Sequence, residues 1–153
     1  MTSNTISVGE LLYEATVHLT KVSEYGVGLE AVMGGKIKPP PEGARFDMAF
    51  DGVVHGPKVN GRIAGVDYVH VRADGRAQLH IHAEITTDEG EKIALFAEGV
   101  ATPEPGSGLM HLRESVTLTT SSPSYAWVNH LQVWAQGIVD STKGEVNVKG
   151  YAA

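Results

Sequence analysis

The chain has 153 residues, of which 42% are hydrophobic and 20% charged, as expected for one globular domain with a sizeable core. Its formal net charge of -6 and its lack of a basic cluster argue against nucleic acid and anionic membranes as partners. Without cysteine, the chain can form no disulfide and no thiolate site. We find neither a signal-peptide pattern nor an apolar run long enough to span a membrane, and we expect a cytoplasmic protein.

Short segments rich in valine, isoleucine, threonine and aromatic residues alternate with turn signals along the chain. In chain order they cover residues 14–22, 45–54, 67–73, 77–87, 92–101, 112–120, 125–139 and 145–151. No stretch of 12 residues holds a convincing helical period, so the pattern predicts an all-β sandwich or barrel. We expect one domain over residues 1–153, with its core at 11–151. The proline-rich stretch 38–43 is predicted to be a lid, a rim element or a plain surface loop.

Two hairpins can be aligned from their turns. The sequence RADGR at 72–76 predicts a three-residue loop with Gly75 in the left-handed region. The predicted pairs then run from Arg72–Arg76 through Val71–Ala77, His70–Gln78 and Val69–Leu79 to Tyr68–His80. The next turn, TDEGE, would place His82 beside Phe96 and His80 beside Glu98.

This register separates the strand residues into two faces. The apolar face carries Val69, Val71, Ala77, Leu79, Ile81 and Ala83, and the polar face carries Tyr68, His70, Arg72, Gln78, His80, His82 and Glu84. The polar face could simply meet water. Histidine combined with aromatic residues also suits a partly polar cavity, in which case a partner subunit would cover the apolar face. We favour the cavity, and with it a homodimer.

Acid–base chemistry is the leading interpretation of the polar face. His80 or His82 would be the general acid or base, and Glu98 would orient one of them. Asp67 is a second candidate carboxylate, although alternation places it on the opposite face. These side chains could instead only hydrogen-bond a ligand or one another.

A cupin-like metal site is a further alternative for the same strand. Its loose pattern comprises Gly75, His80, His82, Glu84 or Glu89, Gly90, Gly99, Pro105, Gly106 and His111. Because the spacings are wrong by one or more residues in both halves, we predict no metal and no cofactor.

The remaining candidates would bind the substrate. Arg45 would bind a carboxylate, carbonyl or phenolate. Along 122–137, Tyr125, Trp127 and Asn129 share one predicted strand face and Trp134 lies on the other, as core residues or as pocket wall. The full set of predicted wall residues is Tyr25, Tyr68, His70, Phe96, Tyr125, Trp127, Asn129 and Trp134.

Four segments in a fixed order carry a resemblance to a known family. They are residues 42–63, 65–90, 111–137 and 145–151, beginning EGARFDM, GVDYVHV, HLRESVT and EVNVKGY. From about Leu12 to Tyr151 the chain resembles the microbial family called domain of unknown function 3237. That resemblance implies a single antiparallel β-barrel, calycin-like or allene-oxide-cyclase-like, often dimeric, with a small-molecule cavity and no settled activity.

The resemblance also assigns individual positions. Those that match the family are Arg45, Asp67, Arg72, Tyr125, Trp127 and Asn129. The departures are His80 and His82, where an aspartate and an arginine are expected, and Glu98, where an arginine is common. We therefore predict a metal-free isomerase, cyclase, dehydratase or lyase acting on a largely apolar molecule. The alternatives are a non-catalytic carrier of a hydrophobic metabolite and a cupin-like metalloenzyme.

Overall fold

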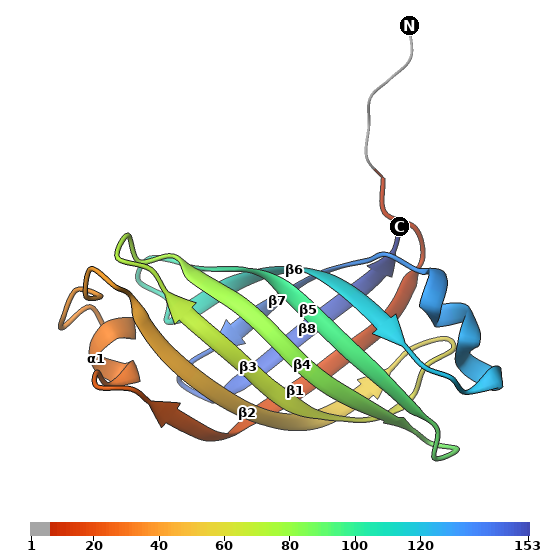
Figure 1. Ribbon diagram of the computed structural model, residues 1–153. Helices are drawn as coiled ribbons and strands as arrows, with labels where there is room; N and C mark the ends of the chain where they lie inside the picture. The colour runs from red at the N-terminus through yellow and green to blue at the C-terminus, as the bar shows by residue number, and fades with distance from the viewer. Residues whose placement is uncertain (1–6) are drawn as a thin grey trace, which may run out of the picture.

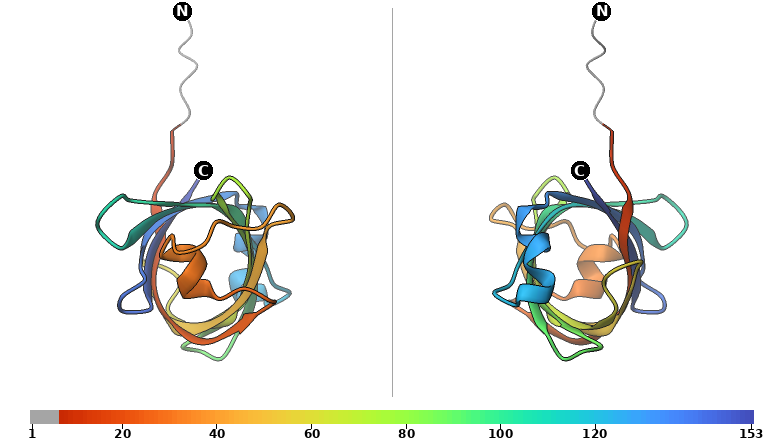
Figure 2. Two further views of the ribbon diagram at one scale, coloured as in Figure 1. Left: turned by 90° about the vertical axis from the view of Figure 1, so that its left-hand side faces the viewer. Right: turned by 90° about the vertical axis from the view of Figure 1, so that its right-hand side faces the viewer.

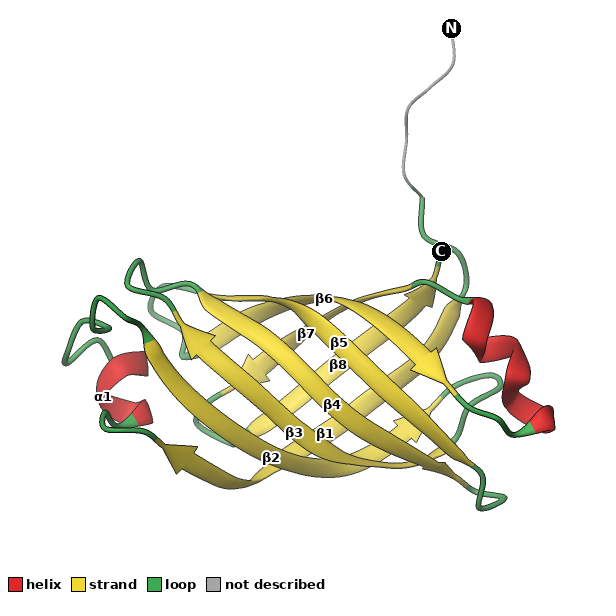
Figure 3. Cartoon of the chain, viewed as in Figure 1, coloured by secondary structure: helices red, strands yellow, loops and turns green. Residues whose placement is uncertain are grey.

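The computed structural model describes residues 7–153, which form a closed antiparallel barrel of eight strands (Figures 1 and 3). Each strand pairs with its neighbours in the sequence, and β8 closes the barrel against β1. The strands are β1 Leu11–Glu24, β2 Ala44–His55, β3 Gly61–Val71, β4 Ala77–Thr87, β5 Lys92–Pro103, β6 Leu109–Thr119, β7 Val133–Asp140 and β8 Glu145–Ala152. The predicted all-β barrel is confirmed, and no described helix is long and apolar enough to cross a membrane.

The two hairpins adopt the predicted register. Gly75 has a φ of 88°, and its N–H donates to the carbonyl oxygen of Arg72 at 2.8 Å. Further along, His80 lies opposite Glu98 and His82 opposite Phe96. The β3–β4 ladder is interrupted between Asp67–Ile81 and His70–Gln78, where the pairs Tyr68–His80 and Val69–Leu79 were predicted. There the backbone N–H of His80 donates to Oδ1 of Asp67 at 3.0 Å, because this carboxylate takes the place of a backbone acceptor.

The apolar face of the strands points into the barrel. Val69, Leu79 and Ile81 are buried, whereas His80 and His82 are exposed on the outer surface. The prediction that the polar face lines the cavity is therefore wrong. A closed barrel buries its apolar face within its own wall, so the polar face is free to meet water without a partner subunit.

The two ends of the barrel differ (Figure 2). The short helix α1, Leu29–Met33, lies across one end, and the 3-10 helix η1, Pro123–His130, lies at the other. The predicted strand at 125–139 thus begins only at Val133, because Pro123 starts a helical turn. Fully buried side chains fill the η1 end, and these include Val54, Ile85, Ile93, Val128 and Val133.

Candidate active site

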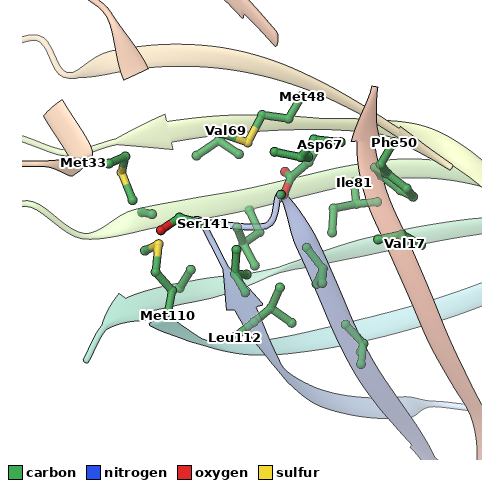
Figure 4. Close-up of a pocket in the computed structure, with 18 of the residues that line it drawn as sticks. Val17, Met33, Met48, Phe50, Asp67, Val69, Ile81, Met110, Leu112 and Ser141 are labelled. Atoms are coloured by element: carbon green, nitrogen blue, oxygen red, sulfur yellow. The ribbon is translucent and has the colours of Figure 1, made fainter. Parts of the chain in front are cut away.

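The barrel encloses a cavity of about 500 Å³ between its filled end and α1. All eight strands contribute to its wall, which is almost entirely apolar (Figure 4). Met48, Val69, Ile81 and Leu112 are typical wall residues, and their side chains converge on the same space in Figure 4. A cavity of this volume lies within the usual range of small-molecule sites.

Helix α1 and the turn between β7 and β8 line the mouth of the cavity. Leu29, Glu30 and Met33 come from α1, and Ser141 and Thr142 come from the turn. Because Gly35 has a φ of 73°, the chain can leave α1 directly after one turn. The predicted lid at 38–43 contributes no residue to the cavity lining, so α1 occupies the position predicted for that loop.

Two carboxyl groups interrupt the apolar wall. Asp67 on β3 and Glu114 on β6 both point inward and line the cavity. Burial raises the pKa of Asp67 to about 6, against a smaller lowering effect from the His80 N–H. Burial, reinforced by the negative charge of Asp67, raises the pKa of Glu114 to about 8. Near pH 7, one of the two groups is therefore mainly ionised and the other mainly protonated.

Glu114 has fewer hydrogen bonds than Asp67 does. Within residues 7–153, its buried Oε2 atom has no hydrogen-bond partner. Tyr13 on β1 also lines the cavity, and burial followed by the charge of Glu114 raises the pKa of its phenol. Gly150 makes room for that ring, since a Cβ there would lie 2.6 Å from two Tyr13 ring carbons. The site thus holds a carboxylate, a carboxylic acid and a phenol.

No lysine, arginine or histidine is among the residues that line this cavity in the described part of the chain. The negative charge shared by Asp67 and Glu114 therefore has no side-chain counter-ion inside. Two carboxyls whose environments separate their pKa values are the arrangement by which enzymes keep one acid and one base at the same pH. The interior can consequently donate a proton and accept another within a largely apolar space.

The predicted catalytic histidines lie outside the barrel. His80, His82 and Glu98 are exposed, and Tyr68 and Phe96 flank the histidines on the same outer face. None of these side chains lines the cavity. Of the four predicted catalytic residues, Asp67 alone points inward.

Arg45 and Tyr25 also lie on the outer surface. Arg45 Nε donates to Asp47 Oδ1 at 2.8 Å, and the Tyr25 hydroxyl donates to Asp47 Oδ2 at 2.6 Å. These two hydrogen bonds lower the pKa of Asp47. The prediction that Arg45 and Tyr25 line the substrate pocket is wrong, because both side chains are exposed and neither is among the residues that line the cavity.

The aromatic segment around η1 belongs to the filled end of the barrel and its exterior. Tyr125 is buried and donates to Glu89 Oε2 at 2.8 Å, and Asn129 forms two hydrogen bonds with the backbone of Thr120. Trp127 is partly buried, and Trp134 is 42% exposed. None of them lines the cavity, and neither does His70, so these residues are core or surface instead of pocket wall.

The cupin-like set of ligands is not brought together. Glu84 pairs with Lys92, Glu89 accepts from Tyr125, and His111 pairs with Glu104 at 3.3 Å. Within residues 7–153, no three histidine, aspartate or glutamate side chains form a group that could hold a metal ion.

Glu114 was not predicted from the sequence, although a signal was present. Along β6 it alternates with Leu112, Val116 and Leu118, which are all buried. A carboxyl at an apolar-face position is unusual because burying it is unfavourable without a partner. Asp67 occupies the same kind of position between Ile63 and Val69 on β3.

Comparison with known proteins supports the fold. The family model described as a protein of unknown function, DUF3237, matches residues 17–153, which confirms the resemblance found in the sequence. No curated protein matches the chain.

Three solved structures illustrate the structural similarity. A β-barrel-like protein from Acinetobacter baumannii AYE has a TM-score of 0.77 at 21% identity, covering 99% of both chains. A protein of unknown function from Clostridium acetobutylicum has a TM-score of 0.76 at 23% identity, covering 94% of this chain and 97% of that one. A structure described as an enzyme from Penicillium herquei has a TM-score of 0.62 at 18% identity, covering 98% and 99%. At these identities the likeness establishes the fold alone.

Proposed function

The chain belongs to the DUF3237 family of proteins of unknown function, and from that premise we propose that it is a cofactor-independent enzyme performing acid–base chemistry inside its barrel. The supporting observation is the pair Asp67 and Glu114, two inward carboxyls with raised pKa values in an apolar cavity. The reaction would be an isomerisation, a cyclisation, a dehydration or another lyase-type elimination on a small organic molecule.

The two carboxyls would take opposite roles at neutral pH. Asp67, mainly ionised, is the general base that removes a proton from a C–H or O–H group. Glu114, mainly protonated, is the general acid that donates to a carbonyl oxygen, a double bond or a departing hydroxyl group. One proton leaves the substrate and one enters it, which leaves Asp67 protonated and Glu114 ionised. Proton exchange with water then restores both groups, so no oxidant or reductant is needed.

The cavity lining restricts the class of substrate. Apolar side chains cover most of the wall, and no cationic side chain of the described residues is present to bind an anion. A carboxylate ligand beside ionised Asp67 would be repelled without compensation. The substrate is therefore a neutral, largely apolar molecule with one or two polar groups that reach the carboxyl pair.

A non-catalytic carrier remains the second candidate function, because an apolar cavity filled at one end would also hold a hydrophobic metabolite. The carboxyl pair favours the enzyme, since a carrier of apolar molecules gains nothing from burying two ionisable groups. The fold is compatible with catalysis, as a structural neighbour is described as an enzyme. The homodimer and the cytoplasmic location stay predictions.

Proton exchange with solvent provides a test that does not require the substrate to be known. A panel of neutral apolar ketones, enols and phenols is incubated in D₂O with the protein, and deuterium incorporation is followed by mass spectrometry. Asp67→Asn should slow exchange by about 10²- to 10⁴-fold, the usual contribution of a general base. His82→Ala is the control on the outer surface and should leave exchange unchanged.

The outcomes separate the candidate functions. Exchange that persists in Asp67→Asn would contradict the proposed base, and loss of exchange in His82→Ala would restore the role predicted for the outer histidines. Binding of panel compounds with no turnover by the wild-type protein would favour the carrier.

A further inference from the structure

The outer face of β4 carries a histidine pair that the proposed reaction does not use. His80 and His82 are two residues apart on one strand, so both side chains stand on the same side of the sheet. Their Nε2 atoms lie 3.2 Å apart, and both residues are exposed. Two imidazole nitrogens thus lie side by side at hydrogen-bond distance on a face that is open to solvent.

This separation matches the bite that a transition metal requires. Two imidazole nitrogens bound to one tetrahedral zinc ion at about 2.05 Å each lie about 3.3 Å apart. In the metal-free protein, the same nitrogens can share one hydrogen bond, in which one ring donates to the other. A metal ion would replace that proton with little movement of either ring.

Neighbouring side chains hold the two rings in this arrangement. Phe96, opposite His82, has ring-centroid distances of 5.4 Å to His80 and 5.3 Å to His82. Tyr68 on β3 has centroid distances of 6.3 Å and 6.1 Å to the same rings. Aromatic packing on both sides restricts the rotamers of the pair, which lowers the entropy lost when a ligand binds.

The local chemistry also favours a cation. Glu98 is exposed and lies directly opposite His80 in the register, so it adds a negative charge to the same outer face. Ligating histidines commonly donate their second ring nitrogen to a carboxylate, which fixes the tautomer that binds metal. Neutral imidazole nitrogens are preferred ligands for zinc, copper and nickel and poor ligands for magnesium or calcium.

We propose that His80 and His82 form a bidentate surface site for a divalent transition metal such as Zn²⁺. No third histidine, aspartate or glutamate of residues 7–153 completes a closed cage around them. Water molecules, or the same pair from a second copy of the chain, fill the remaining positions. The site lies outside the barrel and is separate from the Asp67 and Glu114 pair.

Titration with Zn²⁺ alone tests the site. Untagged, chelator-free protein is titrated by calorimetry, with His80→Ala and His82→Ala as variants. Removing either ring leaves a monodentate ligand, so zinc should bind at least about tenfold more weakly in both variants. The matched control is His111→Ala, which removes a partly exposed histidine of β6 that pairs with Glu104 and should leave the affinity unchanged.

Cu²⁺ provides a second readout that depends on the number of nitrogen ligands. Electron paramagnetic resonance of the copper-loaded protein should show splitting from two imidazole nitrogens in the wild-type chain and from one in His82→Ala. One metal per chain, or one per two chains, supports the pair. Equal zinc affinity in wild type and His82→Ala, or no zinc binding at millimolar concentration, overturns the proposal.

Discussion

Replacing Glu114 by glutamine should stabilise the protein at alkaline pH. The raised pKa means that the folded protein holds the proton of Glu114 more tightly than the unfolded chain does. Between about pH 4.5 and about pH 8, the folded state keeps a proton that the unfolded chain has lost, so the free energy of unfolding falls as pH rises. Glutamine is similar in shape and carries no charge, so the free energy of unfolding of the variant should not show this fall with rising pH.

The size of the effect follows from the two pKa values. They differ by about 3.5, from 4.5 in the unperturbed group to about 8 in the folded protein, and each unit corresponds to about 1.4 kcal/mol. Full ionisation of Glu114 therefore costs about 5 kcal/mol of stability as an upper limit, and water that enters the cavity reduces it. We expect Glu114→Gln to gain about 2 to 5 kcal/mol over the wild type at pH 9 and to match it within about 1 kcal/mol at pH 5.

Urea unfolding at pH 5, 7 and 9 measures this difference directly, provided that the slope of the transition is the same in both proteins. The exposed variant Glu98→Gln on β5 is the matched control, because its carboxyl is already in contact with water. A stability difference between Glu114→Gln and wild type that does not grow with pH would refute the assignment of Glu114 as a buried, protonated acid.

Three further outcomes are expected. If the carboxyl pair is catalytic, the plot of rate against pH should be bell-shaped, rising near pH 6 and falling near pH 8. A rate that does not change over that range would exclude the pair. Leu112→Trp, which points into the cavity, should abolish binding of the neutral fluorescent probe N-phenyl-1-naphthylamine, whereas Thr117→Trp on the outer face of the same strand should not. Gly99→Ala should lower the free energy of unfolding by about 1 to 3 kcal/mol, because its Cβ would collide with the Arg113 carbonyl oxygen. Gly28→Ala meets only Glu24 Oε2 at 3.6 Å and should change stability little, and thermal unfolding of both variants measures the difference.

The sequence predicted the fold better than the site because strand pairing is a local property. Gly75 required a left-handed turn, that turn determined the register, and the register placed His80 opposite Glu98. Alternation separates two faces but does not say which of them is inside. The histidine-rich face was chosen as the interior on chemical grounds, whereas the barrel buries the face that excludes more apolar surface from water.

The interior carboxyls illustrate the same limit. Asp67 could be placed on the apolar face from the alternation of side chains along its strand, but its contact with the His80 backbone depends on the exact β3–β4 geometry. The pKa of Glu114 is raised first by burial and then by the charge of Asp67, which lies three strands away in the sequence, and both causes exist only once the barrel has closed. Likewise, Pro123 and the 3-10 turn that follows it interrupted an apparently continuous strand pattern.

The filled η1 end has a consequence for kinetics. Within residues 7–153, buried side chains such as Val54, Ile85 and Val133 close the η1 end, so a reactant and its product must pass through the same opening beside α1. Each product molecule has to depart before the next reactant can arrive. Product that remains in the barrel therefore excludes the next substrate molecule, and the product of such an enzyme should inhibit it by competing with substrate for the cavity.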